Sequence, residues 1–248
     1  MSVPKYKIDA VIFDLDGTLL DTEALSDKAM LAVLEPWLDE TVKEECQADS
    51  HRLPWALKKQ ILGLRGAEWA PIVLNYAAMH WNIVDKISPE KLWSEWERQL
   101  NLLCHEVEAC PGAMNLVKFF AKESLPMGIA TSSRKDSVTK KSTRHGEMFG
   151  KISVIVTGDH PAVIHGKPAP DIYLEAARQL TIENTKKCLV FEDALSGVRS
   201  GKAAGCIVVA VPDPRFSSAE KELFRTEADI VLDSLQDFSW DLLKDKIQ

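Results

Sequence analysis

Two aspartates stand one residue apart where an apolar run ends, and their spacing suggests a metal site. Asp14 and Asp16 follow the run Ala10–Phe13, and Gly17 comes directly after them. Alternate residues of an extended chain face the same side, so both carboxylates should face one site. Neighbouring carboxylates repel each other unless a cation or a proton holds them. The pair therefore favours an oxygen-ligated divalent cation, with Mg²⁺ as the expected occupant, over the alternative of an acidic turn.

Hydroxyl groups and a lysine follow two further apolar runs. Thr131 and Ser132 close one of them, ahead of a segment with helical periodicity. A hydroxyl and the backbone N–H groups at a helix start can hold an anion, although the same residue types are ordinary helix caps. Lys167 lies in a later loop, between a glycine and a proline. It is either a fixed cation or a solvated loop charge.

A fourth apolar run ends in acids again. Glu192 and Asp193 follow Cys188–Phe191 and precede a glycine-containing helical pattern. Asp193 could be a simple helix cap, since a helix start favours negative charge. Four runs that each end in polar groups are harder to explain separately than together.

The elements that must position these groups alternate between strand and helix patterns. Six short β-rich runs predict strands: Ile8–Phe13, Pro126–Thr131, Ile152–Thr157, Cys188–Phe191, Cys206–Val211 and Asp229–Leu232. Helical periodicity between them predicts helices at Gly112–Glu123, Lys135–His145, Pro170–Gln179, Ala194–Ala204 and Ser217–Thr226. This alternation predicts an α/β fold, a Rossmann-like parallel sheet with helices on both faces. Parallel strands open at one edge, so the four polar groups should converge there.

The converging groups have the chemistry of phosphoryl transfer. Acids around Mg²⁺ with a hydroxyl and a lysine can neutralise the phosphoryl oxygens while a nucleophile attacks phosphorus in line. No cysteine or serine stands in a recognisable motif with a partner base, so the nucleophile should be a carboxylate.

A long segment between the first two strands contains no convincing strand. It reads as four helices: Glu23–Leu38, Pro54–Leu62, Ala67–Trp81 and Pro89–His105. Such an insertion is too long for a loop, so we expect a helical cap domain at 21–107 within an α/β core domain at 1–20 and 108–248. Six of the seven tryptophans lie in it, either as the core of a helical bundle or, for one or two of them, as the lining of a substrate cleft.

Composition excludes several other classes of protein. The 248 residues carry a formal charge of -7 with no basic stripe, which disfavours a nucleic-acid polymer as partner. No apolar stretch reaches the ~20 residues of a membrane span, and no signal-peptide pattern opens the chain. The five cysteines show no zinc-site spacing. We expect a cytoplasmic and possibly nuclear protein that is a monomer or a weak dimer.

Taken together, the motifs resemble the haloacid dehalogenase (HAD) superfamily of aspartyl-phosphate phosphohydrolases over essentially the whole chain. The similarity extends to the branch with pseudouridine 5'-phosphatases and plant glycerol-3-phosphatases. It rests on these stretches: Ala130–Arg134, Ser142–His145, His165–Asp171, Cys188–Ala194, Val211–Arg215 and Ser234–Phe238.

The resemblance implies a role for each residue at the strand ends. Asp14 matches the nucleophile, and Asp16 matches the acid/base that protonates the leaving alcohol and then activates water. Thr131 and the Ser132 backbone match the phosphate-binding groups, and Lys167 matches the lysine that bridges phosphate and nucleophile. The metal ligands implied are Asp14, Asp193 and the Asp16 carbonyl, with Glu192 as a ligand or as a group behind the ligands.

The resemblance also implies that the helical insertion is a mobile cap that selects the substrate. Its segment Leu62–Trp69 departs from the related pattern, and Arg65, Glu68 and Trp69 are our candidates for contacting the leaving group. We expect Mg²⁺-dependent hydrolysis of a small phosphorylated metabolite, such as pseudouridine 5'-phosphate or a sugar or polyol phosphate. The alternatives are a sugar-phosphate mutase and a catalytically silent binding or regulatory protein of the same fold. A 2-haloacid dehalogenase is disfavoured, because that branch does not need Asp16 or the metal site at Asp193.

Overall fold

The chain divides into two compact units. The computed structural model describes residues 8–48, 52–61 and 66–244. One unit comprises Met1–Asp21 with Val107–Gln248, and the other comprises Thr22–Glu106. Each unit is described here by itself.

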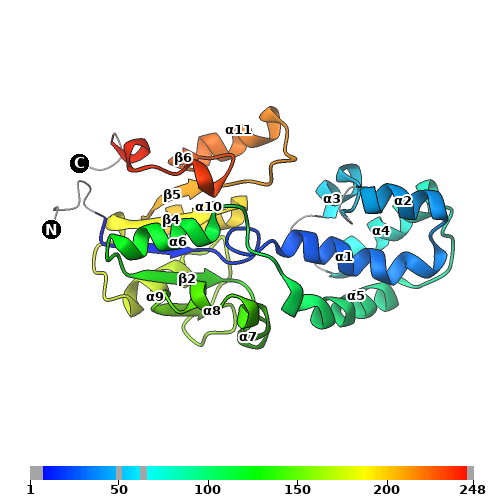
Figure 1. The fold of residues 1–248 in the computed structure, drawn as a ribbon, viewed down its shortest axis with the longest axis horizontal. Coiled ribbons are helices and arrows are strands. Elements are labelled where there is room, and N and C mark those ends of the chain that lie inside the picture. The colour runs from blue at the N-terminus through cyan, green and yellow to red at the C-terminus, as the bar shows by residue number, and fades with distance from the viewer. Residues whose placement is uncertain (1–7, 49–51, 62–65, 245–248) are drawn as a thin grey trace. The chain divides into compact units, whose positions relative to one another are not determined.

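A six-stranded parallel sheet forms the centre of the first unit (Figure 1). Its strands are β1 (Ala10–Phe13), β2 (Met127–Thr131), β3 (Val154–Thr157), β4 (Cys188–Glu192), β5 (Ile207–Ala210) and β6 (Ile230–Val231). Their order is β3-β2-β1-β4-β5-β6. β2 and β3 thus lie on one side of β1, and β4, β5 and β6 lie on its other side. The carboxyl ends of strands beside such a reversal are where open α/β sheets bind ligands.

Helices cover both faces of this sheet, which confirms the predicted fold class. They are α6 (Ala113–Lys122), α7 (Lys135–Lys141), α8 (Gly146–Phe149), α9 (Asp171–Gln179), α10 (Leu195–Ala203) and α11 (Ser218–Glu227). Single 3₁₀ turns lie at Ser142–Arg144, Thr185–Lys187, Leu235–Asp237 and Trp240–Leu243. One face packs on α9, α10 and α11, and their buried residues share one apolar cluster with the sheet.

The strands are apolar on both sides because both sides are buried. Ile12, Val190 and Val208 point into the cluster with α9, α10 and α11. The alternate residues Phe13 and Phe191 stack on the other face, with ring centroids 5.3 Å apart, next to Phe120 of α6. Continuous apolar runs of this kind are typical of strands in a covered parallel sheet.

The second unit is helical among its described residues. It contains α1 (Thr22–Leu34), α2 (Glu40–Ala48), α3 (Trp55–Ile61), α4 (Gly66–His80) and α5 (Pro89–Leu103), with 3₁₀ turns at Glu35–Trp37 and Cys104–Glu106. Trp69 and Trp81 are buried in its core, and Trp37 and Trp96 pack against that core. Four of the six tryptophans of this segment therefore serve the helical core. Across the described residues, no helix has both the length and the apolar character of a membrane span.

A buried ion pair lies inside the helical unit. The ammonium of Lys58 is 2.6 Å from a carboxylate oxygen of Asp27 and 2.5 Å from one of Glu23. The side chains of Lys58 and Asp27 are 3% and 0% exposed. A buried charge of this kind is retained only with a close partner.

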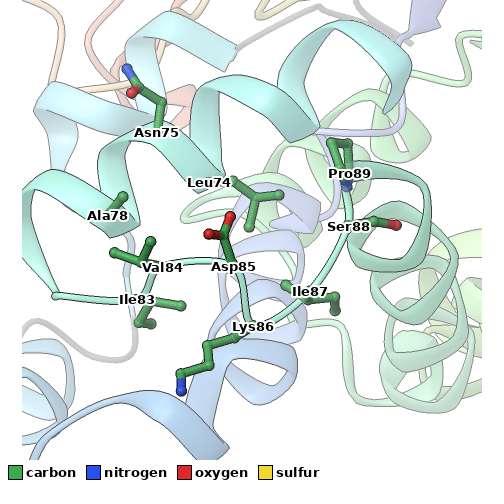
Figure 2. A pocket seen from close by; sticks show the side chains of 10 residues that line it. All are labelled: Leu74, Asn75, Ala78, Ile83, Val84, Asp85, Lys86, Ile87, Ser88 and Pro89. Carbon is green, nitrogen blue, oxygen red and sulfur yellow. The ribbon is translucent and has the colours of Figure 1, made fainter.

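A hollow of about 590 Å³ opens on the helical unit between α4 and the segment that leads into α5 (Figure 2). Leu74 and Ile87 line it together with the charged Asp85 and Lys86. None of the residues predicted to do chemistry lines this hollow, so it does not enter the functional argument.

The two chain passages that join the units are hydrogen-bonded to each other. Leu20 and Ala109 form an antiparallel bridge. The Asp21 N–H donates to the Glu108 carbonyl at 2.9 Å, and the Cys110 N–H donates to the Leu19 carbonyl at 2.9 Å. The entry and exit of the helical unit are therefore tied together on the α/β side.

Candidate active site

The first strand positions its aspartates through a tight turn at its carboxyl end. The Asp14 N–H donates to the Phe191 carbonyl at 2.9 Å, which holds the end of β1 against β4. Gly17 has φ +89, a conformation that side chains disfavour. A Cβ atom at this position would also overlap the Asp193 carboxylate. Glycine therefore lets the backbone after β1 approach the acid at the end of β4.

Lys167 connects the acids of β1 and β4. Its ammonium donates to Asp14 Oδ1 at 2.5 Å, to Glu192 Oε1 at 2.6 Å and to the Ala130 carbonyl at 3.1 Å. Burial opposes the charge of this lysine, but Asp14 and Glu192 outweigh burial and raise the pKa of Lys167 above its ordinary value. Lys167 is thus a fixed cation rather than a solvated loop charge.

For Asp14, burial outweighs the charge of Lys167. Loss of solvent raises the pKa of Asp14 to about 8, with Lys167 opposing the rise and the neighbouring Glu192 and Asp16 adding to it. Its second oxygen, Oδ2, is buried and accepts no hydrogen bond from any residue that the structure describes. Asp14, Glu192 and Asp193 offer oxygen atoms within 4.8 Å of one another. This oxygen donor set fits a divalent cation, which would also hold Asp14 in its ionised form.

Glu192 anchors the lysine from the opposite side. It is 1% exposed, and its Oε1 accepts from Lys167 and, at 2.7 Å, from the hydroxyl of Tyr173. Its Oε2 accepts from the backbone N–H groups of Asp193 and Ala194 at 3.1 and 3.2 Å. Of the two roles expected for Glu192, these contacts favour a group behind the ligands, because both oxygens already have donors.

Asp16 faces a different set of partners from Asp14. Its Oδ2 accepts from the hydroxyls of Thr131 at 3.0 Å and Ser133 at 2.7 Å. Its Oδ1 accepts from the ammonium of Lys141 at 2.5 Å. Burial would raise the pKa of Asp16, but the charge of Lys141 and these hydrogen bonds hold that pKa below its ordinary value. These contacts favour the ionised form of Asp16, so a proton has to reach it before it can act as an acid.

The structure thus brings together Asp14, Asp16, Thr131, Lys167, Glu192 and Asp193. The side chain of Ser132, whose backbone is the group expected to bind phosphate, is exposed. The hydroxyl of the next residue, Ser133, donates to Asp16. Sequence reasoning missed Lys141 and Tyr173, which reach the site from α7 and α9. The signal for Lys141 is its spacing of three residues from Val138, since both lie on the buried face of α7.

The three candidates in the helical unit have different surroundings. Arg65 lies outside the described residues. Glu68 is exposed in the first turn of α4. Trp69 is 6% exposed and packs edge-on against Trp96, with ring centroids 5.2 Å apart.

Two relatives of this chain are named as phosphatases. The chain is 36% identical to "(DL)-glycerol-3-phosphatase 2" of Arabidopsis thaliana over 93% of this chain and 89% of the relative. It is 34% identical to "Probable pseudouridine-5'-phosphatase" of Drosophila melanogaster over 94% of this chain and 92% of the relative. The phosphatase activity expected from the sequence is thereby supported.

A solved structure and a family model agree with these relatives. The crystal structure of a HAD family hydrolase from Deinococcus radiodurans R1, with bound phosphate and sodium, superposes with a TM-score of 0.72 at 25% identity. The superposition covers 98% of this chain and 99% of that one. The family model described as haloacid dehalogenase-like hydrolase matches residues 8–205. The chain therefore belongs to the haloacid dehalogenase-like hydrolases.

Proposed function

We propose that this phosphatase hydrolyses a small phosphomonoester through an aspartyl-phosphate formed on Asp14, with Mg²⁺ as its cation. The observation that carries the proposal is the environment of Asp14 at the end of β1. One of its oxygens is paired with Lys167 at 2.5 Å, and the other is buried without a hydrogen-bond donor among the described residues. Asp14 also offers an oxygen within 4.8 Å of oxygens of Glu192 and Asp193.

The metal would be held by Asp14, Asp193 and the main-chain carbonyl of Asp16. When bound, Mg²⁺ supplies positive charge that neutralises phosphoryl oxygens. Glu192 acts through Lys167, whose ammonium it holds between its own carboxylate and that of Asp14. The ammonium of Lys167 can then offset charge on both the nucleophile and the incoming phosphoryl group.

In the first step, a carboxylate oxygen of Asp14 attacks phosphorus while the bond from phosphorus to the leaving oxygen breaks. The hydroxyl of Thr131 donates to a phosphoryl oxygen. Asp16, which must carry a proton at this stage, gives that proton to the leaving alcohol. The products are the acyl phosphate on Asp14, the free alcohol and ionised Asp16.

In the second step, water attacks the phosphorus of the acyl phosphate and Asp16 accepts a proton from it. The bond between phosphorus and the Asp14 oxygen breaks, and inorganic phosphate leaves. Asp14 is ionised again and Asp16 is protonated again, so the cycle closes without a further reactant.

For the substrate, we propose either a nucleotide like pseudouridine 5'-phosphate or a sugar or polyol phosphate like glycerol 3-phosphate. The names of the relatives support these two classes. We further propose that the helical unit is the cap that selects among them, with Arg65, Glu68 and Trp69 as candidates for contacting the leaving group.

Phosphate release from a panel of monoesters, with and without Mg²⁺, tests the proposal. The panel contains pseudouridine 5'-phosphate, uridine 5'-monophosphate, glycerol 3-phosphate and several hexose phosphates. Asp14→Asn should abolish turnover, and Asp16→Asn should lower kcat by the ~10²–10⁴ typical of lost acid–base catalysis. Asp136→Asn, the same change at an exposed position of α7, is the matched control.

Two outcomes would contradict hydrolysis as the reaction. Isomerised sugar phosphate without free phosphate would identify a mutase. No conversion of any ester by the well-folded protein would identify a binding or regulatory protein. Activity retained by Asp14→Asn would show that the nucleophile is a different residue.

A further inference from the structure

Lys141 is a buried lysine at the active site for which the reaction above has no role. Its side chain is 8% exposed, although it lies at the end of a short, largely exposed helix. Its ammonium donates to Asp16 Oδ1 at 2.5 Å and to the Ser133 hydroxyl at 2.9 Å. A buried ammonium has to be matched by charge and hydrogen bonds, and both partners of Lys141 belong to the group around Asp16.

The two lysines of the site serve different acids. Lys167 donates to Asp14 and Glu192, on the side of the expected nucleophile and metal. Lys141 donates to Asp16, on the side of the hydroxyls at the end of β2. The charge of the expected acid/base is therefore balanced separately from that of the nucleophile.

The contacts of Asp16 are divided between its two oxygens. Oδ1 accepts from Lys141, whereas Oδ2 accepts from the hydroxyls of Thr131 and Ser133. A hydroxyl has a single proton to donate. If the Thr131 hydroxyl donates its hydrogen bond to a phosphoryl oxygen, Asp16 Oδ2 loses that donor, while Oδ1 keeps the hydrogen bond from Lys141. The Thr131 contact is thus exchangeable, whereas the lysine contact can persist.

We propose that Lys141 is a positioning residue for Asp16, which retains Oδ1 while Oδ2 is released toward the leaving oxygen. This inference rests on the proposed function, because it takes Asp16 as the acid/base. Lys141 acts through Asp16 and has no contact with the nucleophile in the proposal. Loss of Lys141 should therefore slow the steps in which Asp16 transfers a proton and leave the other steps unchanged.

Leaving groups that differ in their need for a proton test this directly. An alkoxide needs a proton as it leaves, whereas p-nitrophenolate leaves without one. Lys141→Met should lower kcat/KM, which covers only the steps up to departure of the leaving group, about 10- to 100-fold for the alkyl ester of the panel that the wild type hydrolyses fastest. The same variant should change kcat/KM for p-nitrophenyl phosphate by less than about threefold.

Two controls separate this role from a structural one. Lys140→Met makes the same substitution at the exposed neighbouring position of α7 and should leave both rates unchanged. Lys141→Met combined with Asp16→Asn should be no slower than Asp16→Asn alone, because a residue that acts only through Asp16 has nothing left to position. Lys141→Arg keeps the charge and should recover part of the alkyl-ester rate, which protects the test if the methionine variant folds poorly.

Each contrary result overturns a specific claim. Equal losses on both esters, or additive losses in the double variant, would overturn the positioning role while leaving phosphatase chemistry intact. A wild-type protein that turns over neither ester would overturn the proposed function, and this inference with it.

Discussion

Gly197 is outside the set of reacting groups, yet a single methyl group at this position should dislocate the active site. It lies in the first turn of α10, and a Cβ atom there would overlap the carboxylate of Glu192. Glu192 is 1% exposed and holds Lys167 and Tyr173 at 2.6 and 2.7 Å. In Gly197→Ala the glutamate must therefore move away from both partners or the helix must shift.

The expected loss of stability in Gly197→Ala follows from these contacts. Disturbing a buried ion pair costs about 3–5 kcal/mol, because the remaining charge stays buried. Alanine has a better helix propensity than glycine, and this offsets about 1 kcal/mol of the lost stability. The free energy of unfolding of the α/β unit should thus fall by about 2–4 kcal/mol. The kcat should fall as well, because the position of Lys167 depends on Glu192.

Urea unfolding followed by far-UV circular dichroism measures the change in stability. Tryptophan fluorescence would follow mainly the helical unit, which contains six of the seven tryptophans. Gly146→Ala is the matched control, since a Cβ atom at Gly146 has no neighbour within 4 Å among the described residues. It should stay within about 0.5 kcal/mol of the wild type. If Gly197→Ala matched this control in both stability and kcat, the reasoning about Glu192 would be refuted.

Three further predictions concern the cation, the buried pair of the helical unit and pH. Chelation with EDTA should remove phosphate release, and added Mg²⁺ should restore it; full activity of the metal-free protein would contradict the proposed cation. Asp27→Ala leaves Lys58 buried beside Glu23 alone and should lower the stability of the helical unit by about 3 kcal/mol. Tryptophan fluorescence during urea unfolding measures this loss. The double variant Asp27→Leu with Lys58→Met should recover most of the lost stability. Glu23 and Asp27 outweigh burial and raise the pKa of Lys58 above its ordinary 10.5, so the stabilisation from this pair is complete below about pH 10 and is lost as pH rises through the raised pKa. Lys58→Met should abolish that alkaline loss, and an unchanged pH dependence in the variant would disprove its origin in Lys58.

The sheet could be predicted from sequence because a covered parallel sheet requires apolar runs of strand length. Five of the six predicted runs contain a whole strand of the structure, and β4 extends one residue beyond the remaining run, to Glu192. The sequence does not predict the helix α2, because its nine residues are mostly polar; among its residues with described side chains, Val42 and Cys46 are the buried ones. The predicted helix Glu23–Leu38 ends earlier, at Leu34, and a 3₁₀ turn containing Pro36 follows, since proline cannot continue the hydrogen-bond pattern of an α-helix.

The polar groups at strand ends were predictable for the same topological reason. The parallel sheet brings Asp14, Thr131 and Glu192 to one edge, so their positions follow from the order of the strands. Lys141 and Tyr173 carry no such signal, because they reach the site from helices with long side chains. Which residues of a helix point toward a site depends on how that helix packs, and periodicity alone does not determine this.

The paired passages at Leu20 and Ala109 have a consequence for how this protein can be rearranged. Because the two cut ends lie side by side and are already hydrogen-bonded, a short turn could join them without displacing the end of β1. Residues 22–106 are therefore an exchangeable cassette: a different helical insert could be grafted between the same two points while the sheet keeps its register. A library of such chimeras, with Asp14 and Lys167 held constant, would explore new substrates without rebuilding the chemistry.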